Sequence, residues 1–161
     1  MGKTLIAYFS ASGNTAKLAK TFSEVLNGEL CEIKPAVKYT SADLNWNDKK
    51  SRSTLEMNDD SSRPAIDGCP ETDGFDNVVL LFPIWWYQAP RIIQTFLESC
   101  DLSGKTIITV CTSGGSGLGR TIDILKASCS PSTKWTEGKR FSPSASAAEI
   151  KNWTDTLPVQ R

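Results

Sequence analysis

Three continuous apolar segments, separated by segments with helical periodicity, constrain the fold of this chain more than any other feature. Residues 4–9, 77–82 and 106–111 are rich in β-branched and aliphatic side chains and lack a strict polar–apolar alternation. Such segments are typical of parallel strands covered on both faces. Between them, apolar residues recur at helical spacing in 18–26 and 92–100. This alternation of strand and helix predicts an α/β fold with a doubly wound parallel sheet.

Weaker signals complete the set of predicted elements. Local composition indicates a short strand near 30–33, a helix near 118–128 and a fifth strand near 134–141. The final helix is better marked, because Ser146 and Glu149 have the spacing of a capping box ahead of further apolar residues. We therefore predict five strands in one parallel sheet.

The stretch 35–74 differs from the rest of the chain, which at 161 residues has the usual size of one domain, residues 1–161. It is polar and rich in Asn, Asp, Ser and Lys. Its isolated apolar residues are Tyr39, Leu44, Trp46, Leu55 and Ile66. A structureless connection of this length is uncommon in a compact domain. We predict a partly helical excursion or a functional loop here.

Charge and residue usage disfavour several classes of function. Eighteen Lys and Arg balance 18 Asp and Glu, so no long-range field recruits nucleic acid or an anionic membrane. Histidine is absent, which removes the commonest general base and metal ligand, and no metal site is predicted. The chain shows no signal peptide and no apolar run that could span a bilayer. Five scattered cysteines fit reduced thiols in a cytoplasmic protein.

The loop after the first predicted strand can bind an anion. It contains small and hydroxyl-bearing residues, namely Ser10, Ala11, Ser12, Gly13, Asn14 and Thr15. Free N–H groups and the positive end of the helix dipole would point at the anion. An ordinary strand-to-helix turn with Ser or Asn capping would show the same composition. Taken alone, this loop leaves both interpretations open.

The loop after the second core strand is unusually aromatic. It contains Pro83, Ile84, Trp85, Trp86 and Tyr87. Exposed aromatic residues between prolines suggest a stacking platform for a flat ligand. The alternative is an aromatic plug buried under the polar excursion, and we expect this role for one of the two tryptophans.

The loop after the third core strand is rich in glycine and opens a helix. It contains Thr112, Ser113, Gly114, Gly115, Ser116 and Gly117. The glycines do not match the G-x-G-x-x-G fingerprint, which argues against a nicotinamide-type Rossmann site. A backbone of this kind can approach the edge of a ring closely.

These three loops together resemble the flavodoxin family. The first carries YFSASGNT at 8–15, and the others carry the PIWW and TSGGSG segments of one branch of flavodoxin-like proteins. The resemblance implies bound flavin mononucleotide (FMN) and a sheet order of 2-1-3-4-5. It also implies phosphate contacts from Ser10 to Thr15 and isoalloxazine contacts from the second and third loops. Tyr87 departs from this branch, which more often has glycine at that position.

The resemblance implies an FMN-binding electron-transfer protein whose partner is a redox protein or a small electron acceptor. The alternatives are an FMN-dependent NAD(P)H:quinone-type oxidoreductase and, on the same fold, a cofactor-free signalling module. A phospho-acceptor receiver is disfavoured, because Ser10 and Pro83 stand where it needs acidic residues. No catalytic residue or oligomeric state is assigned. We expect Trp86 to stack on the ring, with Trp46 facing it or packing in its own loop.

Electron-shuttling flavodoxins are usually strongly acidic, whereas this chain has no net charge. A local acidic patch can still supply part of the field that guides a redox partner. Its members would be Asp43, Asp48, Glu56, Asp59 and Asp60.

Overall fold

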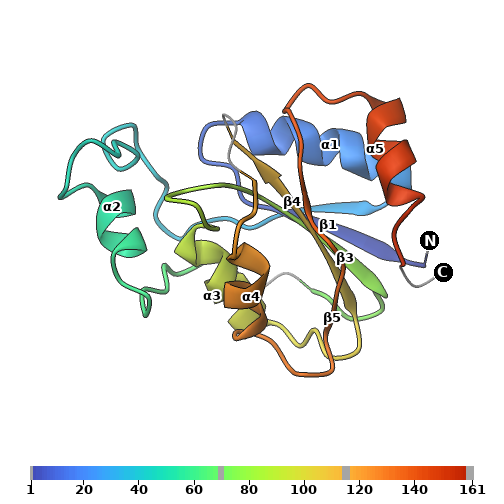
Figure 1. Ribbon diagram of the computed structural model, residues 1–161. Coiled ribbons are helices and arrows are strands. Elements are labelled where there is room, and N and C mark those ends of the chain that lie inside the picture. The colour runs from blue at the N-terminus through green and yellow to red at the C-terminus, as the bar shows by residue number, and fades with distance from the viewer. Residues whose placement is uncertain (1, 69–70, 114–116, 159–161) are drawn as a thin grey trace.

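The computed structural model describes residues 2–68, 71–113 and 117–158. A parallel sheet forms its centre, with helices on both faces (Figure 1). The strands are β1 (Thr4–Tyr8), β2 (Glu29–Glu32), β3 (Asn77–Pro83), β4 (Thr106–Thr112), β5 (Lys134–Trp135) and β6 (Lys139–Arg140). Their order is β2-β1-β3-β4-β5, and β6 also pairs with β4. The predicted fold class and the order 2-1-3-4-5 are confirmed.

Each face of the sheet buries its own apolar cluster. On one face, Ile6 and Val79 pack with Phe22 of α1 (Asn14–Leu26) and Ile150 of α5 (Ala147–Thr154). On the other, Leu80 packs with residues of α3 (Arg91–Ser99). Alternate strand residues therefore face different helices, which is why the strands read as continuous apolar runs. Each large side chain buried in this way stabilises the fold by about 1.5–3 kcal/mol.

The predicted fifth strand exists in two short parts. β5 and β6 flank residues 136–138, and both parts pair with β4. A Cβ atom at Gly138 would overlap the side chains of Leu118 and Thr109. The chain therefore passes too close to β4 at this point for any residue but glycine, and the ladder is interrupted there.

Helix ends follow local signals, with one difference from the prediction. Ser146 is confirmed as the N-cap of α5, because its Oγ accepts a hydrogen bond of 3.1 Å from the Glu149 N–H, which is one of the two bonds of a capping box. α4 (Thr121–Lys126) is shorter than the predicted helix over 118–128. Gly119 has φ of 55°, in the left-handed region, so the helix begins only after it.

The stretch 35–74 leaves the sheet and returns at one place. Pro35 and Ile66 form an antiparallel bridge, and the N–H of Asp67 donates to the carbonyl of Lys34 at 2.7 Å. Between them lies the short helix α2 (Arg52–Met57), which stands apart from the sheet in Figure 1. We call residues 35–66 the excursion. Within the described ranges, no helix is both long and apolar enough to cross a membrane.

Candidate functional site

The three predicted loops lie at one edge of the sheet, because β1, β3 and β4 are neighbours in register. Tyr8 pairs with Leu81 and Pro83 pairs with Thr112, so the strands end at similar heights. Hydrogen bonds join the loops as well. The hydroxyls of Thr15 and Thr112 are 2.9 Å apart, and the Ile84 N–H donates to the Thr112 carbonyl at 3.1 Å.

The first loop leaves the start of α1 open. Ser10 Oγ accepts a 3.0 Å hydrogen bond from the Gly13 N–H, and Gly13 has φ of 94°. Gly13 is the N-cap residue and has no side chain to cap the helix, and no acidic residue lies in the first turn of α1. Ser12 and Asn14 are exposed, whereas Thr15 is buried. Ser10 Oγ thus takes up the Gly13 N–H, as in an ordinary turn, while Gly13 brings no side-chain oxygen to the amides of the first helical turn as a Ser or Asn cap would.

The aromatic loop is a two-residue hairpin with unusual residues at its tip. Trp85 and Gln88 exchange backbone hydrogen bonds of 2.8 and 3.2 Å. Trp86 and Tyr87 have φ of 48° and 67°. Two positive φ angles are typical of a type I′ turn, in which Asn-Gly is the preferred pair. Each non-glycine residue in this conformation costs roughly 1–2 kcal/mol, and Tyr87 is the residue where the related branch more often has glycine.

The two tryptophans of this hairpin have different environments. Trp85 packs edge-on against Phe9 and Tyr39, with ring centroids 5.8 and 5.6 Å apart. Trp86 is 40% exposed and Tyr87 is 79% exposed. Trp85 is therefore packed against the core, and Trp86 is the more exposed of the two hairpin tryptophans.

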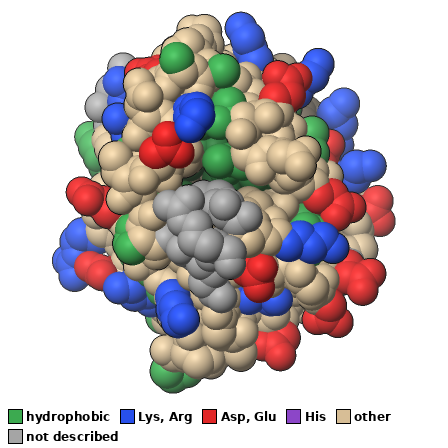
Figure 2. Space-filling view, turned by 90° about the vertical axis from the view of Figure 1, so that its right-hand side faces the viewer, with side chains coloured by type: hydrophobic (Ala, Val, Ile, Leu, Met, Phe, Trp, Pro, Cys, Tyr) green, Lys and Arg blue, Asp and Glu red, His purple; other side chains and the backbone are tan. Residues whose placement is uncertain are grey.

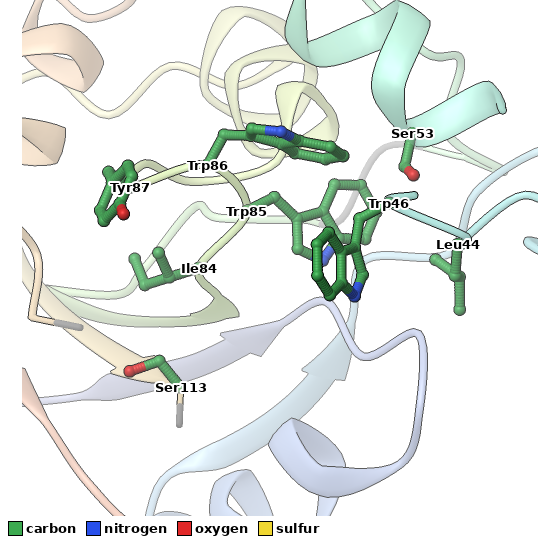
Figure 3. A pocket seen from close by; sticks show the side chains of 8 residues that line it. All are labelled: Leu44, Trp46, Ser53, Ile84, Trp85, Trp86, Tyr87 and Ser113. Atoms are coloured by element: carbon green, nitrogen blue, oxygen red, sulfur yellow. The ribbon is translucent and has the colours of Figure 1, made fainter. Parts of the chain in front are cut away.

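A cleft of about 720 Å³ lies between this hairpin and the excursion (Figure 3). This volume is within the range of small-molecule sites, roughly 300–1,000 Å³. Its walls are Leu44, Trp46 and Ser53 from the excursion, Ile84, Trp85, Trp86 and Tyr87 from the hairpin, and Ser113. Trp46, 71% exposed, thus shares the cleft with Trp86 and does not pack only within its own loop.

The other described site residues that the sequence predicted do not line this cleft. They are Ser10, Ala11, Ser12, Gly13, Asn14, Thr15, Pro83, Thr112 and Gly117. Two of them, Ser10 and Ala11, line a separate cavity of about 290 Å³. Gly114, Gly115 and Ser116 lie outside the described residues. Sequence reasoning gave no site role to Leu44 or Ser53. Leu44 was visible as an isolated apolar residue, but Ser53 carried no signal.

Arg91 holds the two walls of the cleft together. It is only 1% exposed. Its Nε and Nη2 donate to the carbonyls of Glu56 and Met57 at the end of α2, at 3.3 and 3.0 Å. Its Nη1 donates to the side-chain oxygen of Gln88 at 3.0 Å, and Nη2 also reaches Asp60 at 2.9 Å. One guanidinium therefore connects the excursion with the hairpin. This residue has no sequence signal, since arginine is normally exposed.

The predicted acidic patch is partly neutralised. Glu56 forms an ion pair with Arg52 at 3.0 Å, and Asp60 pairs with Arg91. Glu56 also accepts a hydrogen bond from the Tyr39 hydroxyl, and burial together with this bond raises the pKa of Tyr39 above its usual value.

Figure 2 shows basic and acidic side chains interspersed on another face of the molecule, in keeping with the balanced formal charge.

The structure is a doubly wound α/β fold with an aromatic cleft at the carboxyl edge of its sheet, the edge from which the loop into α1 also starts. This is where such sheets bind their ligands. The chain belongs to the flavodoxin family, since the family model described as Flavodoxin matches residues 3–157.

Solved structures agree with this assignment. A candidate flavoprotein from Bacteroides eggerthii is 44% identical, with a TM-score of 0.92 over 99% of this chain and 100% of that one. Another from Bacteroides uniformis is 46% identical, with a TM-score of 0.90 over 96% and 99%. A flavoprotein from Lactobacillus acidophilus, solved in complex with FMN, is 21% identical with a TM-score of 0.70 over 96% and 99%, and it shows the fold alone. No curated protein sequence gives a significant match.

Proposed function

We propose that this protein binds FMN non-covalently in the cleft and transfers electrons to or from a redox partner protein or a small acceptor. One observation carries the proposal: the start of α1, whose N-cap Gly13 has no side chain, is joined through the 2.9 Å contact of the Thr15 and Thr112 hydroxyls to the strand end next to Ser113, which lines the aromatic cleft of about 720 Å³. A flat ring with a phosphate tail needs both features side by side.

The first loop fits the phosphate. The amides at the start of α1 lack a side-chain cap, and the hydroxyls of Ser10 and Ser12 and the amide of Asn14 are close to them in sequence. The loop itself contains no lysine or arginine. Charge on the phosphate would therefore be stabilised by the helix dipole and by hydrogen bonds.

The cleft fits the ring. Trp86 and Tyr87 form one wall, and Trp46 from the excursion shares the same space. FMN, when bound, supplies one- and two-electron redox chemistry. The contribution of the protein is to orient the ring, to restrict water and to provide polar contacts at its edge.

Because the net charge is zero, we expect electrostatic steering to contribute little to the rate at which this protein meets a redox partner. The chain has no formal net charge, and two of the five patch carboxylates are engaged in ion pairs. Steering by a strong field raises encounter rates by about 10–10³-fold and falls steeply with salt. We expect slow direct reduction by NAD(P)H, faster reduction by a partner reductase and a shallow salt dependence of the faster step.

One observation favours a second candidate, an FMN-dependent NAD(P)H:quinone-type oxidoreductase. The exposed rings of Trp86 and Tyr87 leave the cleft accessible to a second flat ligand. Stopped-flow absorbance separates the two functions. Rapid reduction by NAD(P)H alone favours the oxidoreductase, and a steep salt slope with a partner favours an acidic-type shuttle.

Titration calorimetry of FMN, riboflavin and FAD tests the cofactor itself. We expect FMN to bind most tightly, because only its terminal phosphate matches the open amides of α1. Bound FMN should also lose fluorescence through contact with Trp86. A protein without affinity for FMN contradicts the proposal, and equal affinity for riboflavin contradicts the phosphate assignment.

A further inference from the structure

Ser53 carries a buried hydroxyl without a hydrogen-bond partner among the described residues. The residue is 2% exposed, and its Oγ is fully enclosed. Its backbone N–H is already used, since it donates to the Asp43 carbonyl at 2.9 Å. The neighbouring hydroxyls are satisfied, because Ser51 Oγ and Thr54 Oγ1 are 2.9 Å apart. Buried hydroxyls are normally paired with protein, water or ligand.

Ser53 differs in its location from the other residues with an unpaired buried hydroxyl. Thr109 and Thr121 also have unpaired buried hydroxyls, but neither lines the cleft. Ser53 does line it. In the view of Figure 3, Ser53 and Tyr87 are drawn at opposite ends of the labelled side chains that line the cleft. Among the described residues, Ser53 is thus the one that combines an unpaired buried hydroxyl with a place in the lining of the cleft.

The backbone that carries Ser53 is held at both ends of α2. Ser51 caps the start of the helix by accepting from the Thr54 N–H. Arg91 binds the carbonyls of Glu56 and Met57 at the other end. The hydroxyl is therefore presented from a fixed element, which is what a specific contact requires.

We infer that Ser53 is a ligand-binding residue, whose hydroxyl forms a hydrogen bond with a polar edge atom of a flat heteroaromatic ring in the cleft. This inference rests on the proposed function and deepens it, since it makes the excursion part of the flavin site. A serine hydroxyl both donates and accepts, so it suits a ring carbonyl, a ring nitrogen or a ring N–H. It contacts the ring and not the phosphate, which lies with the first loop.

Ser53→Ala tests the inference, with Ser41→Ala as the matched control. Ser41 is an exposed serine of the same excursion that does not line the cleft. In calorimetric titrations we expect Ser53→Ala to raise the Kd for FMN and for riboflavin by the same factor, roughly three- to tenfold. Ser41→Ala should leave both values unchanged. The urea midpoint of the flavin-free Ser53→Ala variant should equal or exceed that of the wild type, because no hydrogen bond is lost.

Each outcome decides one question. Unchanged affinity of Ser53→Ala for both flavins overturns the inference, as does a loss confined to FMN. A clear fall in the urea midpoint of the flavin-free variant also overturns it, since that result assigns Ser53 a structural role. Failure of the wild type to bind either flavin contradicts the proposed function and this inference with it. Binding by the wild type with an equal loss for both flavins in the variant supports both.

Discussion

The two walls of the cleft are built in different ways. The hairpin wall grows directly from β3, and its neighbour β4 fixes it through the ladder and the Ile84–Thr112 hydrogen bond. The excursion wall is attached by the Pro35–Ile66 bridge, the ring contacts of Tyr39 and the guanidinium of Arg91. Strand order therefore places one wall, whereas a few long-range side-chain contacts place the other.

Replacing Arg91 should have the largest effect and should reveal this difference. Arg91→Met leaves the carbonyls of Glu56 and Met57 without their donor, and each unpaired buried group costs about 1–3 kcal/mol. We expect the free energy of unfolding, measured in urea, to fall by about 3 kcal/mol. Amide hydrogen exchange should accelerate in α2 while β3 and β4 keep their protection.

Arg63→Met is the control for the loss of an arginine. Arg63 pairs with Glu98 at 2.9 Å, and both side chains are partly exposed. Its removal should cost less than about 1 kcal/mol. Equal loss of protection in α2 and β3 of the Arg91 variant would show that the two walls of the cleft open as one unit and are not held independently.

On the sheet side of the site, Thr15→Val tests the phosphate contact. If Thr112 donates to Thr15 across their 2.9 Å contact, the Thr15 proton is available to the phosphate. A hydrogen bond to a charged group is worth roughly 1.5–3 kcal/mol. We expect FMN binding to weaken by this amount and riboflavin binding to stay the same, as measured by calorimetry.

Thr112→Val removes only the orienting hydroxyl and should weaken FMN binding less than Thr15→Val does. Losses well below 1.5 kcal/mol in both variants would mean that the backbone amides of α1 provide nearly all of the phosphate affinity.

Tyr87→Gly should have the smallest effect, and it stabilises the protein. Tyr87 has φ of 67°, which glycine adopts without strain. The relief of about 1–2 kcal/mol is reduced by the greater chain entropy of glycine, so we expect a net gain of about 0.5–1 kcal/mol in urea unfolding. Gly13→Ala is the reciprocal change, because Gly13 has φ of 94° and open space around it, and it should destabilise by a similar amount. A loss of stability in Tyr87→Gly would show that the tyrosine ring contributes more than its backbone strain costs.

The sheet and the positions of its loops were predictable from the sequence. The apolar runs that end at Phe9, Phe82 and Cys111 predict where the buried strands end. The interruption at Gly138 was not predictable, since it depends on how closely the chain passes Thr109. Trp86 was the tryptophan expected to face a ligand, whereas the ring contacts that hold Trp85 against Phe9 and Tyr39 arise from the folded chain and have no sequence signal.

The second wall was harder to predict for a related reason. Arg91 is one of the most buried side chains, and its carbonyl partners lie 34 and 35 residues away in the sequence. Ser53 belongs to a polar segment in which no periodicity marks one serine from another. Contacts between distant polar residues leave no local pattern, so only the folded chain identifies them.

The bridge between Pro35 and Ile66 also has a consequence for the evolution of the sequence. Since the excursion departs and rejoins at adjacent points, insertions or deletions within it leave the pairing of β2 with β1 and of β1 with β3 intact. The size of the cleft and the polarity of its outer wall can therefore change without altering the loop that opens α1, as long as partners for Arg91 and Tyr39 are kept.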